Sequence, residues 1–340
     1  MTYNQAQYIC DTLNGFVEQK TDFPYIIMLT DDASTDGEQD VIRSFVNKNF
    51  EVENTEVAYE KDTEYATIVY AQHRTNRNCF IVVHNLKYNH YQKGLKKLPY
   101  LAEWRGASQY EAMCEGDDFW IDPEKLQKQV NCLDADPETV MCYTDFNIYN
   151  QKSGRTDYSL FTTCSDKFPM VYESAEEFVY KAGYVCPPSW LYRSEAWPKT
   201  SIPSLDGTFV LFTHFMMSGK VVALPDVTTT YRKLPESASH SQDLGKLLKR
   251  ARSIYDTQCR LIDHYGMNQD LKGKCKERYY RRHLASFIVG DAKDELVEYR
   301  NCIKTRGYKE KILLLLSATK PGVLLLKSVH RLNMRLKANK

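Results

Sequence analysis

Residues 114–130 read CEGDDFWIDPEKLQKQV, and this stretch decides the fold. A helix is predicted over Pro123–Ala135, because Asp122 can cap it and a proline suits its first position. Adjacent carboxylates at a strand end repel each other, and they persist where a cation or several donors neutralise them. Asp117 and Asp118 are therefore predicted to hold Mg²⁺ or Mn²⁺ together with substrate phosphates. The alternative is that they cap the loop before the helix.

Outward from this stretch, strand-like and helix-like segments alternate. Strands are predicted at Pro24–Thr30, Cys79–His84, Tyr110–Cys114, Thr139–Thr144 and Pro188–Arg193, and helices at Asp36–Asn47, Tyr91–Trp104 and Thr208–Ser218. Further strands over Val221–Arg232 are expected to break at Pro225. This order predicts an α/β fold with a mixed, mostly parallel sheet and flanking helices. Ligands bind at the carboxyl ends of strands in such sheets, where Asp31-Asp32 also lies.

Three motifs in order along the chain resemble a known family. They are Met1-Thr-Tyr-Asn-Gln5, Asp31-Asp-Ala-Ser-Thr-Asp-Gly37 and the segment Glu115–Val130. Together they resemble family 2 glycosyltransferases of the bacterial surface-polysaccharide type, which have the Rossmann-like GT-A fold. The resemblance continues through Gly219-Lys220 and Tyr231-Arg232 and covers about two thirds of the chain. It implies metal-dependent, inverting transfer of a sugar from a nucleotide diphosphate sugar to a saccharide or lipid-linked acceptor.

The resemblance also implies roles for single residues. Thr2, Tyr3 and Asn4 are expected beside the nucleotide base, with Tyr3 packing on it or, alternatively, lying in the core. Asp32 or its neighbour Asp31 is expected to hydrogen-bond the base. The remaining assignments place Asp117 on the ribose or the metal and Asp118 on the metal, while Asp36 is expected to cap a helix.

The sequence departs from the family at the catalytic base. Inverting transfer needs a group that accepts the acceptor hydroxyl proton. Thr208 stands where the family has an acidic residue, so Asp206 is the candidate base and Glu236 a weaker one. A threonine cannot act as a base near neutral pH, so a catalytically impaired nucleotide-sugar or glycan-binding homologue is the alternative function.

A nucleotidyltransferase is disfavoured, because no Gly-rich, Lys/Arg-bearing phosphate loop is present. His240 is a candidate for contact with the diphosphate or metal, or a solvated loop residue, and Arg232 could pair with phosphate or form a structural ion pair.

A second departure concerns the first strand, which the family places directly before the Thr2-Tyr3-Asn4 motif. We expect that strand upstream of Met1. Residues 1–240 are expected to form the catalytic domain. Residues 241–303 are expected to form a helical extension and residues 304–340 a basic, apolar tail.

The tail carries ten Lys/Arg residues and one acidic residue, in a chain of net charge +1. Its leucine runs and basic residues over 312–337 suit peripheral contact with an anionic membrane. Alternatively, the leucines pack on the catalytic domain. The scattered ten cysteines favour a reducing compartment. We therefore expect a cytoplasmic protein, with the inner face of the plasma membrane as its site of peripheral contact, and no nucleic-acid partner.

Overall fold

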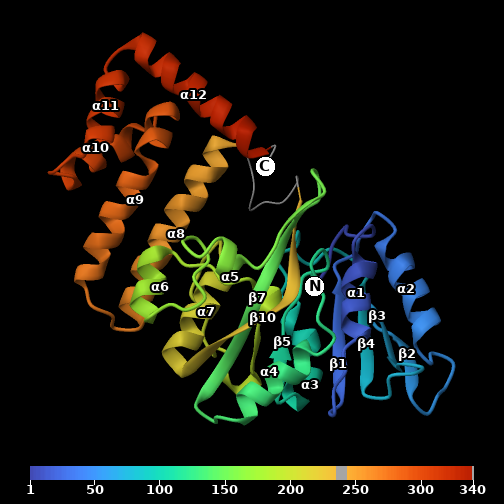
Figure 1. Cartoon of the computed structure of the whole chain (residues 1–340). Coiled ribbons are helices and arrows are strands. Elements are labelled where there is room, and N and C mark those ends of the chain that lie inside the picture. Colours follow the sequence, from blue (N-terminus) through green and yellow to red (C-terminus); the bar gives the residue numbers. More distant parts are fainter. Residues whose placement is uncertain (235–242, 339–340) are drawn as a thin grey trace.

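The computed structural model describes residues 1–234 and 243–338, and the side chains among them except those of residue 98 and residues 333–338. Glu236 and His240, considered above as base and as ligand, lie outside the described residues. The chain forms two mixed β-sheets side by side, followed by a bundle of helices, as Figure 1 shows.

The first sheet belongs to the N-terminal quarter of the chain. Its elements are α1 (Ile9–Val17), β1 (Tyr25–Asp31), α2 (Glu38–Asn49), β2 (Ala58–Asp62), β3 (Ala66–Gln72) and β4 (Cys79–Leu86). The strand order is β1-β4-β3-β2, with β1 and β4 parallel and the other pairs antiparallel. A buried cluster that includes Ile9, Leu13, Leu29, Ile42 and Ile81 joins α1 and α2 to this sheet. Burial of these apolar side chains holds the layer together.

The second sheet carries the acidic loop. Its elements are η1 (Leu98–Leu101), α3 (Ala102–Ala107), β5 (Tyr110–Ala112), β6 (Phe119–Trp120), α4 (Lys125–Asp134), β7 (Thr139–Asn150), β8 (Arg155–Asp157), α5 (Leu160–Thr163), α6 (Ala175–Lys181), η2 (Pro187–Ser189), β9 (Leu191–Arg193), η3 (Ser194–Ala196), α7 (Gly207–Ser218) and β10 (Lys220–Lys233). The strand order is β5-β9-β7-β10-β6, and β8 pairs with β7.

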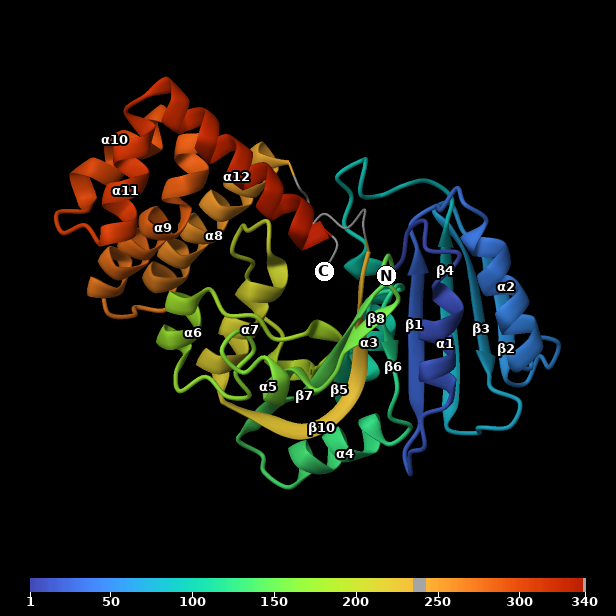
Figure 2. The same ribbon diagram turned by 45° about the horizontal axis from the view of Figure 1, so that its top comes forward.

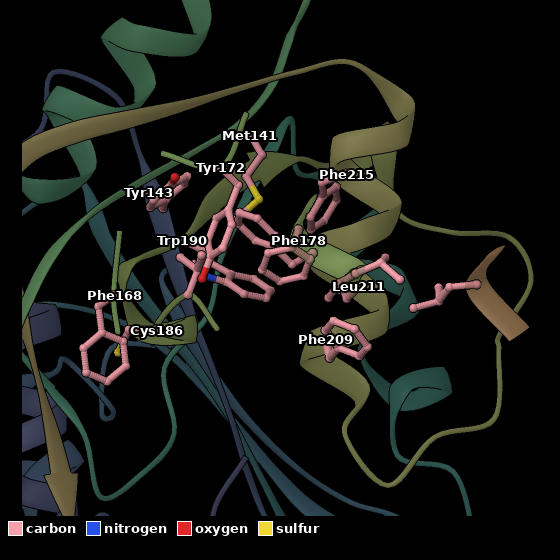
Figure 3. Close-up of a cluster of buried hydrophobic side chains, with 14 of the residues drawn as sticks. Met141, Tyr143, Phe168, Tyr172, Phe178, Cys186, Trp190, Phe209, Leu211 and Phe215 are labelled. Atoms are coloured by element: carbon pink, nitrogen blue, oxygen red, sulfur yellow. The ribbon is translucent and has the colours of Figure 1, made fainter. Parts of the chain in front are cut away.

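The largest core lies between this sheet and the helices that cover it. Figure 3 shows its aromatic centre, where Trp190 lies among the rings of Phe178 and Phe215. Trp190 and Phe215 are fully buried, and Phe178 is 1% exposed. Residues of α8 and α9, such as Leu261 and Cys275, belong to the same cluster. The C-terminal helices α8 and α9 therefore pack against α6 and α7 and complete this core.

The α/β class is confirmed, but the expectation of a mostly parallel sheet is wrong. Only β1–β4 and β7–β10 run parallel among the strand pairs of the described residues. The periodicity of the sequence reports burial and does not report strand direction. In β10 the register shifts between Leu224 and Val227, on either side of Pro225. The proline thus produces a bulge in one long strand, where the sequence predicted a break.

The helix predicted over Tyr91–Trp104 is also wrong in its first half. Residues 91–94 form a turn, residues 95–97 are irregular, and only η1 and α3 are helical. The Asp32 carboxylate accepts hydrogen bonds from the backbone N–H groups of His90 and Tyr91 and from Lys97 Nζ. These hydrogen bonds to Asp32 replace the backbone hydrogen bonds of a helix in this segment. Because Asp32 is distant along the chain, the local sequence does not reveal it as the partner.

The first motif continues the edge of β1. Thr2 forms a parallel bridge with Asp31: its N–H donates to the Thr30 carbonyl at 2.9 Å, and its own carbonyl accepts from Asp32 N at 3.1 Å. Within the described residues, β1 is otherwise the outer strand of its sheet. Figure 2 shows the N-terminus beside β1, between the two sheets.

The C-terminal region is helical, as expected. It consists of α8 (Leu244–His264), α9 (Asp270–Val289), α10 (Lys293–Cys302), α11 (Tyr308–Ser317) and α12 (Lys320–Ala338). The apolar tail breaks into α11 and α12, which are bent by 120° relative to each other. A Cβ at Gly322 would lie 2.0 Å from the Leu316 carbonyl oxygen, so this tight approach requires glycine.

None of the helices in the described part of the chain is, by itself, both long and apolar enough to cross a membrane, although the bent pair α11–α12 passes that test when taken together. Leu313, Leu314 and Leu326 pack on the helical cluster around α9. Leu315 and Leu324 instead are 73% and 63% exposed. The tail therefore packs on the helical bundle and not on the catalytic domain, which was the alternative expectation. Part of its apolar surface stays exposed.

Candidate functional site

An acidic loop between β5 and β6 forms the centre of the candidate site. One carboxylate oxygen from each of Glu115, Asp117 and Asp118 can be chosen so that all three lie within 4.8 Å of one another. Glu115 is exposed, Asp117 is half-buried and Asp118 is 1% exposed. The loop therefore presents three converging carboxylates that reach from the protein interior to the surface.

The buried carboxylate is only half satisfied by protein donors. Asp118 Oδ1 accepts a hydrogen bond from the Arg232 backbone N–H at 2.7 Å. Asp118 Oδ2 is buried and has no hydrogen-bond partner among the described residues. Burial, followed by the negative charge of Asp117, raises the pKa of Asp118 well above its usual value. An orphaned buried oxygen beside two further carboxylates is the donor set that a hard divalent cation completes.

Arg232 holds the acidic loop in place. Its Nε donates to the Asp117 carbonyl at 2.8 Å, and its Nη2 pairs with Asp11 on α1 at 2.6 Å. Its guanidinium also lies over the rings of Tyr8 and Phe119. Of the two roles considered for Arg232, the structure shows the structural ion pair, because its donors are engaged within the protein.

The first motif lies directly against the acidic loop. A Cβ at Gly116 would come within 2.5 Å of both Thr2 Oγ1 and Gln5 Oε1, so only glycine allows this approach. Thr12 on α1 donates its hydroxyl to the Gly116 carbonyl at 2.9 Å. Residues more than a hundred positions apart are thus brought together at one edge of the two sheets.

Within this motif the side chains have different environments. Thr2 is buried and donates to Glu38, whereas Tyr3 is 40% exposed and Asn4 is exposed. Asn4 takes a left-handed backbone conformation with φ of 55°, and its Oδ1 accepts from the Thr35 N–H at 2.8 Å. Tyr3 therefore does not lie in the core, which was the alternative to its packing on a base.

Glu38 is a structural residue that the sequence analysis did not single out. It is fully buried, and its Oε2 accepts from the Gln5 N–H and from Ser34 Oγ, each at 2.9 Å. Asp36 accepts from the Glu38 N–H at 3.1 Å, which supports the capping role expected for it. Through these contacts Glu38 ties the first motif to the second.

Asp31 and Asp32, predicted to recognise the base, are buried and already bound by protein donors. Asp31 accepts from the Ser34 N–H and from Gln39 Nε2. Asp32 accepts from Lys97 and the 90–91 backbone, as described above. Burial opposes ionisation of Asp32, but these donors outweigh it and hold its pKa below the usual value. A base that reaches Asp32 has to displace Lys97, and the role of both aspartates in base recognition stays a prediction.

Asp206, the candidate base, caps α7. Its Oδ1 accepts from the Phe209 N–H at 3.3 Å and from the Thr208 hydroxyl at 2.9 Å. Its Oδ2 pairs with Arg250 of α8 at 3.0 Å. Asp206 and Thr208 line a cavity of about 160 Å³ that Tyr184 also lines. Both carboxylate oxygens of Asp206 are therefore engaged by protein donors.

The structure therefore groups Asp117, Asp118 and the first motif as predicted, and adds Glu115 as a third carboxylate. Glu115 stands in the quoted segment, so the acidic spacing E-x-D-D was the signal that pointed to it. The positioning role of Arg232 had no comparable signal, because Asp11 lies 221 positions away.

Comparisons with known proteins place the chain beside mycobacterial proteins without an assigned activity. No protein-family model matches it. It is 26% identical over 338 residues to uncharacterized proteins of Mycobacterium bovis and Mycobacterium tuberculosis. The alignment covers 97% of this chain and 82% of each of those proteins. The likeness thus extends over both sheets and the helical region.

Proposed function

We propose that this protein is a metal-dependent glycosyltransferase that transfers a sugar from a nucleotide diphosphate sugar to a saccharide or lipid-linked acceptor. The observation that carries the proposal is the convergence of Glu115, Asp117 and Asp118 with an unsatisfied buried oxygen on Asp118. The site is small, acidic and adjacent to an exposed aromatic residue. The resemblance of its motifs to family 2 glycosyltransferases of the GT-A fold supports the same function.

The three carboxylates fit Mg²⁺ or Mn²⁺, since hard cations take oxygen ligands and bind through one or two carboxylates plus phosphates. Such an ion would supply positive charge to the departing diphosphate. Arg232 keeps the Asp117 carbonyl and the Asp118 carboxylate in place for that task. Tyr3, which is exposed beside buried Thr2, offers a flat surface on which a nucleobase can stack.

We assign Asp206 as the base that accepts the proton of the acceptor hydroxyl. In this role its carboxylate has to release Arg250 and bind the acceptor hydroxyl instead. The engagement of Asp206 by Arg250 and Thr208 favours a second candidate function, a binding protein for nucleotide sugars that turns over slowly or not at all.

The tail suits peripheral attachment to an anionic membrane from the cytoplasmic side. The exposed leucines of α11 and α12 share these helices with Lys311, Lys320 and Lys327. Apolar side chains that enter the headgroup boundary and basic residues that attract anionic lipids act together in such contacts. This attachment fits an enzyme that acts on lipid-linked acceptors.

A screen of nucleotide diphosphate sugars by thermal shift, with and without Mn²⁺, tests the function. A ligand that binds the native state raises its melting temperature by mass action. We expect one donor to do so only with Mn²⁺, and Asp117→Asn and Asp118→Asn to lose the effect. Asp62→Asn, an exposed carboxylate on β2, is the matched control.

Release of nucleoside diphosphate from that donor then separates the two functions. Release that Asp206→Asn abolishes supports the transferase and the assigned base. Donor binding without release supports the binding protein. If no donor binds in the presence of Mn²⁺, or if both aspartate variants bind it as the wild type does, the proposal is wrong.

A further inference from the structure

A wide cleft lies at one part of the junction between the second sheet region and the C-terminal helices. It measures about 1140 Å³ and lies between residues 165–172, the end of α6 and one face of α9. Figure 1 shows α6 against α9 at this junction. No motif identified in the sequence falls in this cleft, so the function proposed above does not account for its composition.

Cationic side chains dominate its lining, with six lysines and arginines and two acidic residues. Lys274, Arg278 and Arg282 follow one another at intervals of four residues along α9 and all face the cleft. Like charges at this spacing repel each other and destabilise a helix. A row of three is therefore expected to serve a bound anion.

These cations are available to a ligand. Lys274 and Arg282 are exposed, and neither forms an ion pair with a carboxylate of the described residues. Arg278 donates to the Lys181 carbonyl at 3.1 Å and lies over the Tyr180 ring, but it too lacks a carboxylate partner in the described chain. Arg281, by contrast, pairs with Glu277 and Glu310.

Aromatic side chains form the opposite wall. Phe168, Tyr172, Tyr180 and Tyr184 line the cleft, and the Tyr172 hydroxyl accepts a hydrogen bond from the Tyr184 N–H at 3.2 Å. Rings with polar edges beside cations suit a ligand that combines apolar ring faces with negative charge. A sugar that carries phosphate has both features.

The cleft is continuous with the candidate active site. Tyr184 and Gly183 line both the large cleft and the smaller cavity that contains Asp206. A molecule held in the cleft can therefore extend past Tyr184 toward Asp206.

We infer that this cleft binds a phosphate group carried by the acceptor, through the row Lys274, Arg278 and Arg282 on α9. The planar guanidinium groups of the two arginines match phosphate oxygens in pairs. Phosphate binding stands on the cleft alone, whereas the identification of the ligand as the acceptor rests on the proposed function. The phosphate can belong to a lipid carrier or to a soluble saccharide.

Titration calorimetry at low ionic strength, with a metal chelator present, tests the inference. The probes are glucose 1-phosphate for a soluble source and farnesyl phosphate for a lipid source. The double variant Lys274→Gln/Arg282→Gln removes two cleft charges from exposed positions. Its matched control is Lys272→Gln/Lys276→Gln, which removes two charges of the same helix that pair with Asp263 and Glu298 outside the cleft.

We expect the wild type and the control to bind at least one probe, and the cleft variant to bind it at least tenfold more weakly. Higher salt should weaken binding in the wild type, because it screens exposed charges. Tighter binding of farnesyl phosphate indicates a lipid carrier, and tighter binding of glucose 1-phosphate a soluble acceptor.

The inference is overturned if the wild type binds neither probe, or if the two double variants weaken binding equally. Donor binding with Mn²⁺ is measured in parallel on the same variants, and the cleft variant should retain it. Phosphate binding without any donor binding leaves the cleft assignment standing and refutes the proposed function instead.

Discussion

Replacing Asp118 by asparagine should stabilise the metal-free protein while abolishing its response to Mn²⁺. Asp118 is 1% exposed, and its ligand oxygen lies within 4.8 Å of those of Glu115 and Asp117. Two unit charges at this distance repel by about 3 kcal/mol at an effective dielectric constant of about 20, and by about 1 kcal/mol in bulk water. Asparagine keeps the oxygen that accepts from the Arg232 N–H and cannot ionise.

The expected gain in the free energy of unfolding is therefore about 1–3 kcal/mol without metal, which corresponds to a rise of a few degrees in melting temperature. With Mn²⁺ at a hundred times its dissociation constant, the wild type should gain about 2.7 kcal/mol and the variant nothing. Binding sites commonly trade stability for function in this way.

The assay is thermal and urea unfolding of wild type, Asp118→Asn and the surface control Asp62→Asn, first with a chelator and then with Mn²⁺. The control should match the wild type in both conditions. A metal-free Asp118→Asn protein that is less stable than the wild type, or one that keeps the full Mn²⁺ shift, would refute the reasoning.

Four further predictions follow from the structure. Arg232→Met should lower the free energy of unfolding by about 1–3 kcal/mol, because charged hydrogen bonds are lost, and should weaken Mn²⁺ binding; unchanged metal affinity in calorimetry would contradict its positioning role. Gly116→Ala should cost about 1–3 kcal/mol in urea unfolding, since its Cβ meets two side-chain oxygens, and an equally stable variant would count against this approach. Burial lowers the pKa of Lys125 to about 8, so the folded protein binds fewer protons than the unfolded chain between about pH 8 and 10. Stability should therefore rise with pH in that window, and Lys125→Met should flatten the rise in unfolding curves measured across it. Leu324→Ser/Leu325→Ser should reduce flotation with anionic liposomes, and unchanged flotation would exclude these side chains from membrane contact.

Around the acidic loop, the sequence predicted the local structure. A short apolar stretch, the acids at 115–118 and the helix behind Asp122 were predicted from residues that contact their near neighbours in the chain. In the structure β5 ends at Ala112 and α4 begins at Lys125 with Glu124 as its N-cap, so the helix is confirmed but its start was predicted two residues too early. Asp122 accepts from the Glu124 N–H at 2.9 Å just ahead of the helix. Capping and periodic burial act over a few residues, so their traces survive in the sequence.

The helical character of residues 241–303 was predicted for the same reason. The packing of the tail was not. Which leucines of α11 and α12 lie against α9 depends on the angle between two helices, and the composition of the tail allowed either arrangement. The basic row on α9 likewise forms a cleft only together with the opposite aromatic wall. The residues of that wall lie about a hundred positions earlier in the chain.

The sequence by itself determined the α/β class, several of the strands and helices, and the acidic loop at Asp117 and Asp118. Only the tertiary structure decided the strand directions, the ion pair between Lys97 and Asp32, and the hydrogen bond from Arg232 to the acidic loop. The physical reason is range. Propensity and periodicity are set by neighbours within a turn or two, whereas Lys97 lies 65 positions and Arg232 115 positions from the group each contacts. Such pairs form only when the whole core closes.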